Sequence, residues 1–205
     1  GPGAAGISLL VVDRGTPGFT VSRTLKKMGW LCSDTAELGY SDVRVPAANL
    51  VGPENSGFLQ IMRQFQVERA FLAVQCYATA QRCLDLTLDW VKQRETFGRP
   101  LSTRQVVRHK LVDMATAVDV ARTYTRVAVD RIVAGDTDVR MVSMAKNQAV
   151  EACALAVDTA VQLHGGMGYL RETEVEMHYR DSRILGIGGG TTEIMKEIIA
   201  KHIGL

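Results

Sequence analysis

The sequence lacks most of the features that mark membrane, secreted or nucleic-acid-binding proteins. No window in its 205 residues approaches the ~18 consecutive apolar residues of a membrane-spanning helix. The first residues show no basic segment followed by an apolar one, so we expect no signal peptide. A formal net charge of +2 gives no reason to expect nucleic acid as a partner, because such proteins usually carry one strongly basic face.

Cysteine is scarce and is not arranged as a metal site or a disulfide framework. The four residues form no Cys-x-x-Cys pair, and no His or Asp lies beside them at ligand spacing. We interpret all four as reduced core thiols, with no bound metal. They are Cys32, Cys76, Cys83 and Cys153. Reduced thiols predict an intracellular compartment.

The sequence pattern changes once, near residue 56. Before that point, residues 7–12 are a run of branched apolar side chains, and residues 19–22 and 37–45 alternate as strands do. A few strands without partners do not make a stable sheet. We therefore predict that residues 1–56 are part of an antiparallel β-domain.

From Gly57 onward, apolar residues recur at helical spacing. Gly135 is the expected cap that ends the second helix, residues 136–138 offer an N-cap for the third, and Thr191 or Thr192 is the expected N-cap of the last. Long helices joined by short loops favour an up-and-down bundle, so the predicted fold class is mainly α. The expected helices cover about residues 57–91, 102–133, 139–164, 169–180 and 192–202.

Six short motifs follow one another in a specific order. They are Ser33–Leu38, Asp42–Pro46, Glu54–Phe58, Arg94–Gly98 with Gln105, Gln162–Tyr169 and Gly189–Ile194. In order and spacing they resemble the acyl-CoA dehydrogenase family, from the middle of its β-domain to its C-terminus. The resemblance covers nearly the whole chain. It implies that residues 1–56 are the second half of the family's β-domain and that residues 57–205 are its C-terminal four-helix bundle.

The resemblance also implies a reaction, the α,β-dehydrogenation of an acyl-CoA thioester with FAD as the hydride acceptor. Such a reaction needs a base in contact with the weakly acidic α-proton. In many members the base is a Glu in the last loop, and Gly189 stands at that position here. In the long-chain and isovaleryl types, the base is the Glu of a Glu-Arg pair on the first bundle helix. Glu68 and Arg69 match that pair, so the resemblance implies Glu68 as the catalytic base and suggests a long-chain or branched substrate.

The residues around Glu68 leave two interpretations open. Phe65 and Phe71 lie close to it in sequence and would partly bury the carboxylate. Alternatively, Glu68 is a solvated helix residue that pairs with Arg63, with Arg69 or with a neighbouring helix.

Further residues are implied as contacts to the cofactor or the substrate. Arginine suits a pyrophosphate because its planar fork donates two charge-assisted hydrogen bonds, and a helix N-terminus attracts phosphate. The plainer alternatives are a solvated basic helix end, a helix C-cap and a flexible glycine turn. The implied contacts to the FAD of a neighbouring subunit are Arg94, Phe97, Gln105, Gln162, Gly165 and Gly166, and those at the last helix are Thr191 and Glu193. Arg69 is implied to place the substrate or Glu68, and the N–H of Gly189 to polarise the thioester carbonyl.

The implied partners are an acyl-CoA, an electron-transfer flavoprotein and further copies of the chain in a dimer or tetramer. The family's N-terminal helical domain and the first half of its β-domain are absent from these 205 residues. We therefore expect the chain to be inactive by itself. A second hypothesis is a non-catalytic module that completes a partner's FAD site or serves oligomerisation. A third, a nucleic-acid-binding relative, is disfavoured by the near-neutral charge. The four histidines are interpreted as structural.

Overall fold

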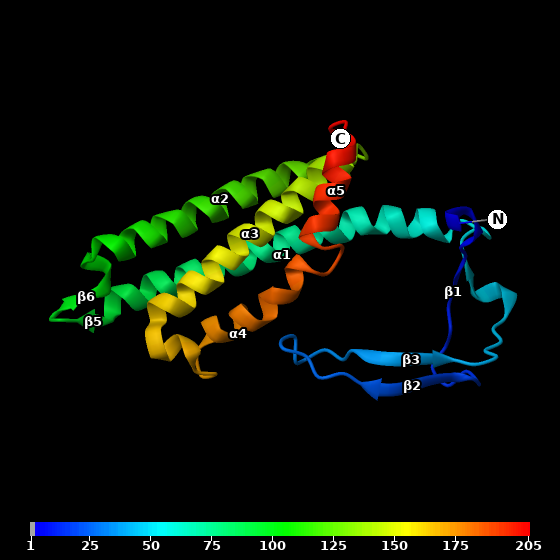
Figure 1. The fold of residues 1–205 in the computed structure, drawn as a ribbon, viewed down its shortest axis with the longest axis horizontal. Helices are drawn as coiled ribbons and strands as arrows, with labels where there is room; N and C mark the ends of the chain where they lie inside the picture. The colour runs from blue at the N-terminus through cyan, green and yellow to red at the C-terminus, as the bar shows by residue number, and fades with distance from the viewer. Residues whose placement is uncertain (1–2) are drawn as a thin grey trace. The chain divides into compact units, whose positions relative to one another are not determined.

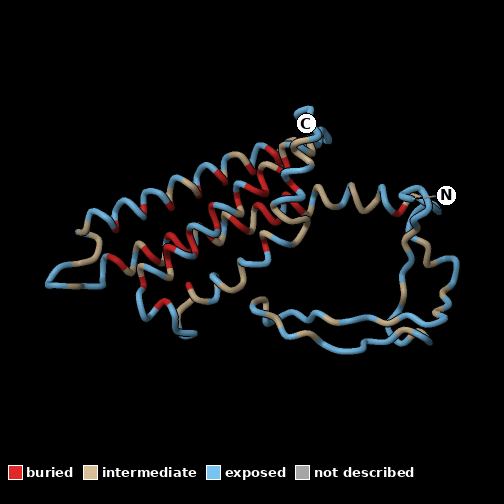
Figure 2. The backbone as a smooth tube through the Cα atoms, viewed as in Figure 1, coloured by how far each residue is buried: buried red, intermediate tan, exposed pale blue. Residues whose placement is uncertain are grey.

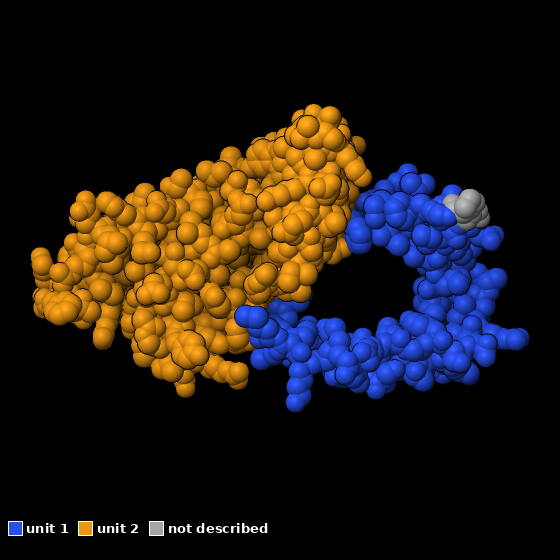
Figure 3. Space-filling model, in the orientation of Figure 1, with its two compact units in different colours: residues 1–65 blue, residues 66–205 orange. Residues whose placement is uncertain are grey.

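The computed structural model describes residues 3–205. The chain divides into two compact units, one up to Phe65 and one from Gln66 to the C-terminus (Figure 3). One long helix, α1 (Gly57–Gln93), runs through the boundary. In the described residues, no helix is long and apolar enough to cross a membrane.

The N-terminal unit consists of short strands paired in twos. β1 pairs with β4, and β2 pairs with β3, both antiparallel. Between positions 3 and 56 no residue is buried, so these strands have no hydrophobic core of their own. Before α1, the elements are η1 (Gly3–Gly6), β1 (Leu9–Leu10), β2 (Phe19–Thr24), β3 (Ala36–Tyr40), η2 (Ala47–Asn49) and β4 (Leu50–Val51).

The C-terminal unit is helical, and its core is built largely from small side chains. α3 packs against α2, α4 and α5, and Figure 1 shows α2 and α3 side by side. Buried positions are concentrated along α1, α2 and α3 (Figure 2). Many of them are alanine or cysteine, which lets helices approach closely. After α1, the elements are β5 (Glu95–Thr96), β6 (Arg99–Pro100), η3 (Leu101–Thr103), α2 (Gln105–Val133), α3 (Val139–His164), η4 (Gly165–Tyr169), α4 (Glu174–Ser182), η5 (Arg183–Gly186) and α5 (Thr192–His202).

The predicted fold class is confirmed, since a helical bundle follows short antiparallel strands. The caps of α3 and α5 also agree with the sequence. Asp138 accepts a hydrogen bond from the N–H of Met141 at 3.0 Å, and the Thr191 hydroxyl accepts one from the N–H of Ile194 at 3.3 Å. Gly135 has φ +77° and follows the cap residue Ala134, which is the usual place for a left-handed glycine after a helix.

Three expectations are wrong in detail. The helix expected from residue 169 begins at Glu174, because the Thr173 hydroxyl donates to the carbonyls of Met167 and Leu170 and holds a turn there. The strand expected over 37–45 ends at Tyr40, two residues before Asp42 adopts a left-handed φ of +50°. Cys32 is an exposed thiol, whereas Cys76, Cys83 and Cys153 are buried as expected.

Candidate functional site

Glu68 on α1 and Gly189 in the loop before α5 lie side by side. A Cβ atom on Gly189 would stand 3.8 Å from Oε1 of Glu68 and 2.7 Å from Cδ1 of Leu72. Gly189 also has φ +65°, a conformation that favours glycine. Glu68 is half-buried, so its carboxylate is partly shielded by protein but still reachable from the surface. The family places its catalytic base at one of two positions, which correspond here to Glu68 and Gly189. These two positions are therefore neighbours in space.

Two buried cations hold the glycine loop. Arg69 is 5% exposed, and its Nε donates to the carbonyl of Gly189 at 2.9 Å. Lys146 on α3 has no exposed surface, and its Nζ donates to the carbonyl of Gly188 at 2.8 Å and to that of Gly190. Burial lowers the pKa of both side chains, and the charge of Glu68 acts against that change. The loop backbone is thus fixed from two helices.

The start of α5 adjoins this loop. Thr191 is its N-cap, and the amide of Asn147 donates to the carbonyl of Thr192 at 3.1 Å. Glu193 is exposed in the first turn, where hydrogen bonds from its own N–H and from the Thr191 hydroxyl lower its pKa. The structure therefore brings Thr191 into the same loop-helix junction as Gly189.

A second group of the expected residues lies at the far end of α1, around the β5–β6 hairpin. Phe97 is 97% exposed and has φ +51°, so a large aromatic side chain is held at the hairpin tip in a backbone conformation unfavourable for it. The guanidinium of Arg104 lies 5.9 Å from the centre of its ring. Arg94 and Gln105 flank the hairpin and are exposed.

The end of α3 is tied to the same end of α1. Trp90 donates to the carbonyl of Leu163 at 3.1 Å and stacks on His164, with 5.0 Å between the ring centres. Gln162, Gly165 and Gly166 are exposed just beside these contacts. No atom lies within 4 Å of a Cβ built on either glycine, so a ligand could approach the backbone there.

The expected site residues therefore form two groups. Along α1, Glu68 and Gln93 are about 38 Å apart at the rise of an α-helix. Glu68, Arg69, Gly189, Thr191 and Glu193 belong to the loop group, and Arg94, Phe97, Gln105, Gln162, Gly165 and Gly166 to the hairpin group. Within residues 3–205, no cluster of His, Cys, Asp and Glu could hold a metal ion.

Comparison with known proteins decides the family. The family model for the acyl-CoA dehydrogenase C-terminal domain matches residues 55–204. The chain belongs to the acyl-CoA dehydrogenase family. It spans only about half the length of the relatives it matches.

Three relatives illustrate the match. The chain is 39% identical over 201 residues to an acyl-CoA dehydrogenase of Bacillus subtilis, covering 98% of this chain and 53% of that protein. It is 40% identical over 200 residues to the mitochondrial long-chain specific acyl-CoA dehydrogenase of Mus musculus, covering 98% of this chain and 46% of the mouse protein. The solved structure of a "probable acyl CoA dehydrogenase" from Mycobacterium abscessus has a TM-score of 0.98 and 67% identity, covering 100% of this chain and 54% of that one.

Sequence reasoning missed Lys146 in this acyl-CoA dehydrogenase family chain. A signal was present, because Lys146 falls within the apolar stripe of α3 that also contains Val142, Ala149 and Cys153. A lysine at a core position of an amphipathic helix must find buried acceptors. The helical spacing of the apolar residues places Lys146 in the core, where it needs hydrogen-bond acceptors. That spacing does not identify the acceptors, which are loop carbonyls more than forty residues later in the chain.

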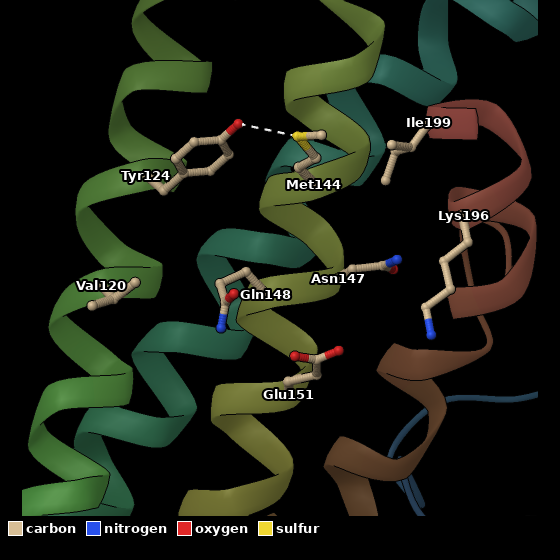
Figure 4. A pocket seen from close by; sticks show the side chains of 8 residues that line it. All are labelled: Val120, Tyr124, Met144, Asn147, Gln148, Glu151, Lys196 and Ile199. Carbon is tan, nitrogen blue, oxygen red and sulfur yellow. Dashed lines mark hydrogen bonds between the residues drawn. The ribbon is translucent and has the colours of Figure 1, made fainter. Parts of the chain in front are cut away.

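A separate groove of about 420 Å³ opens between α2, α3 and α5 (Figure 4). Val120 and Tyr124 line it from α2, and Lys196 and Ile199 from α5. None of the expected site residues lines it. Of the residues that hold the site in place, Asn147 also lines this groove.

Proposed function

We propose that this chain supplies the base and part of the cofactor site of an FAD-dependent acyl-CoA dehydrogenase. The observation that carries the proposal is the position of the half-buried Glu68 carboxylate beside Gly189. A carboxylate at that point can remove the α-proton of a thioester whose carbonyl oxygen accepts from the Gly189 N–H. The long-chain or branched substrate suggested by this base position belongs to the same proposal.

Arg69 is proposed to act through the loop. It is buried, and its Nε already donates to Gly189, so it positions the backbone beside Glu68. Gly189 has the closer role, because its N–H would bind the substrate carbonyl directly. Together these residues hold the α-proton and the thioester oxygen in fixed positions relative to the base.

The two residue groups fit FAD at two different sites. The hairpin group offers an exposed aromatic ring, arginine side chains and open glycine backbone, which suit a ring system and a pyrophosphate. Thr191 and Glu193 would contact FAD at the chain's own site, where the bound cofactor accepts the β-hydride. A separation of about 38 Å along α1 supports the proposal that Arg94, Phe97, Gln105, Gln162, Gly165 and Gly166 serve the FAD of a neighbouring subunit. A homo-oligomer follows from that assignment. An electron-transfer flavoprotein is proposed as the acceptor because the resemblance to the family implies it.

A second candidate is a non-catalytic module that completes a partner's FAD site. It is favoured by the hairpin group, whose residues lie far from Glu68 along α1. These residues could bind the FAD of a partner without any catalytic base. The absence of a core in residues 3–56 also favours it, since these strands require partners from elsewhere.

The test joins this chain to the N-terminal half of the Mycobacterium abscessus relative and compares it with the Glu68→Gln variant. Each protein is incubated with FAD, desalted and examined by absorption before and after octanoyl-CoA, palmitoyl-CoA or isovaleryl-CoA is added. We expect both to retain flavin and only the chain with Glu68 to be bleached, with a rate at least ~10²-fold above that of the variant. If both proteins retain flavin and the thioester bleaches neither, the enzyme proposal is wrong and the non-catalytic module is the remaining candidate. The 205-residue chain alone, treated in the same way, shows whether the module holds flavin without the other half.

A further inference from the structure

We propose that Lys146 is a positioning residue that sets the amide of Gly189 as a preorganised hydrogen-bond donor for the oxygen of a thioester substrate. The inference deepens the proposed function and rests on it for the identity of the ligand. Its structural part rests only on the backbone of residues 188–191 and the two cations that hold it.

Three consecutive carbonyls of the loop accept hydrogen bonds from buried cations. Lys146 donates to Gly188 and Gly190, and Arg69 donates to the carbonyl between them, that of Gly189. Hydrogen bonds from a charged donor are about twice as strong as neutral ones. The orientation of each of these peptide groups is therefore fixed.

Fixing the carbonyls also fixes the amides. In a trans peptide, the N–H points opposite to the carbonyl of the preceding residue, and the described chain has no cis peptide bond. The amides of Gly189 and Thr191 then point away from Lys146, and the amide of Gly190 points away from Arg69. Among residues 3–205, no acceptor takes a hydrogen bond from any of the three. The cations thus leave these three amides as free donors, and the Gly189 amide is the one directed away from Lys146.

The first of these donors stands next to the proposed base. Gly189 lies beside Oε1 of Glu68, so one ligand could offer its carbonyl oxygen to the amide and its α-carbon to the carboxylate. A cation on the carbonyl of Gly188 polarises the peptide between Gly188 and Gly189, which makes that N–H a stronger donor. The ligand class that fits is a thioester whose oxygen gains negative charge as the proton leaves.

The burial of Lys146 needs such a reason. Lysine is almost never fully buried unless paired, and an apolar residue would continue the stripe of α3 without the desolvation cost. No carboxylate in the described residues forms an ion pair with Lys146, and the hydrogen bonds that it donates go to the loop carbonyls of Gly188 and Gly190. Its placement is explained if the loop must be held in one conformation.

The test uses NMR on the isotopically labelled 205-residue chain. The wild type is compared with Lys146→Met and with Lys196→Met, a matched control that removes an exposed lysine on α5. We expect Lys146→Met to move the carbonyl carbon signals of Gly188 and Gly190 and the amide proton of Gly189 upfield, while the carbonyl of Gly189 moves less. Lys196→Met should leave all four unchanged. If the Gly189 amide proton is the same in Lys146→Met as in the wild type, the proposal is wrong.

A measurement on the wild type keeps the proposal testable if Lys146→Met does not fold. A lysine that donates to two buried carbonyls has slowly exchanging ammonium protons, which a ¹H–¹⁵N spectrum selective for ammonium groups detects. Absence of that signal, or Gly188 and Gly190 carbonyl shifts typical of solvated glycine, would overturn the inference.

Titration with octanoyl-CoA, palmitoyl-CoA and isovaleryl-CoA separates this inference from the proposed function. A shift of the Gly189 amide on titration in the wild type, reduced in Lys146→Met, supports both. An amide that depends on Lys146 but does not respond to the thioester in the chain joined to its N-terminal half contradicts the proposed function and leaves the positioning role intact. In that joined protein, Lys146→Met should lower kcat about tenfold to a hundredfold with little change in KM, less than the ~10²–10³ lost when an oxyanion donor is removed.

Discussion

The carboxylate of Glu68 lies 3.8 Å from the point where a side chain at Gly189 would begin. Either position can thus direct a carboxylate at the same small volume. The loop offers less room, because Leu72 stands 2.7 Å from that point and the backbone is left-handed.

Moving the base should therefore require a second change. We expect Glu68→Gln combined with Gly189→Glu to remain poorly active, because the new Cβ meets Leu72 and a non-glycine residue with this φ costs about 1 kcal/mol. Adding Leu72→Val, at about 1 kcal/mol of stability, should restore part of the flavin bleaching by octanoyl-CoA. Equal activity with and without Leu72→Val would show that the contact does not matter.

Phe97 should contribute to cofactor retention and not to stability. In Phe97→Gly, relief of the left-handed strain and the greater freedom of the unfolded chain oppose each other, so the free energy of unfolding should stay within about 1 kcal/mol of the wild type. Flavin retained after desalting should fall in the joined protein, while Phe97→Tyr should retain it. A loss of stability without a loss of flavin would assign Phe97 a structural role.

The ion pair between Arg82 on α1 and Glu174 on α4 should support stability only above acidic pH. Arg82 donates to both carboxylate oxygens at 2.8 Å, and these bonds lower the pKa of Glu174 to about 2. The stabilisation is complete above the ordinary carboxyl value and is lost as the pH falls toward 2. Both side chains are more than a third exposed, so we expect Glu174→Gln to cost no more than about 1 kcal/mol at pH 7. Urea unfolding of the two proteins should converge as the pH is lowered. A difference that persists at pH 2 would mean that packing, not charge, is responsible.

His164 should make the helical unit less stable in mild acid. Burial lowers its pKa, so the folded state prefers the neutral ring that stacks on Trp90. The unfolded chain takes up the proton first, and stability declines as the pH falls below the ordinary histidine value of about 6.5. His164→Phe keeps an aromatic ring against Trp90 and should flatten this part of the stability-pH curve. His202→Phe, at an exposed position on α5, should leave the curve unchanged.

The sequence predicted the helices well because each carries its own periodicity and caps. Of the residues offered for these caps, Asp138 caps α3 and Thr191 caps α5, since a side chain that bonds nearby backbone acts locally. The turn after Gly165 was missed because the Thr173 hydroxyl reaches back to carbonyls that no local pattern identifies.

The candidate site shows the same division. Glu68 and Gly189 were both singled out from the sequence, but only the fold shows that they touch. Lys146 was missed because it donates to backbone carbonyls of a distant loop. Every residue has such a carbonyl, so the sequence does not show which ones accept.

The distance along α1 between Glu68 and the hairpin of Phe97 has a genetic consequence. If each active centre takes Glu68 from one subunit and Phe97 from another, two alleles with different defects can complement each other. Mixed oligomers of Glu68→Gln and Phe97→Gly chains would contain some centres with both defects and others with neither. Unfolding the joined proteins that carry these two changes and refolding them together with FAD should then give more activity than either recovers alone, and a cell that carries both alleles should keep part of its activity.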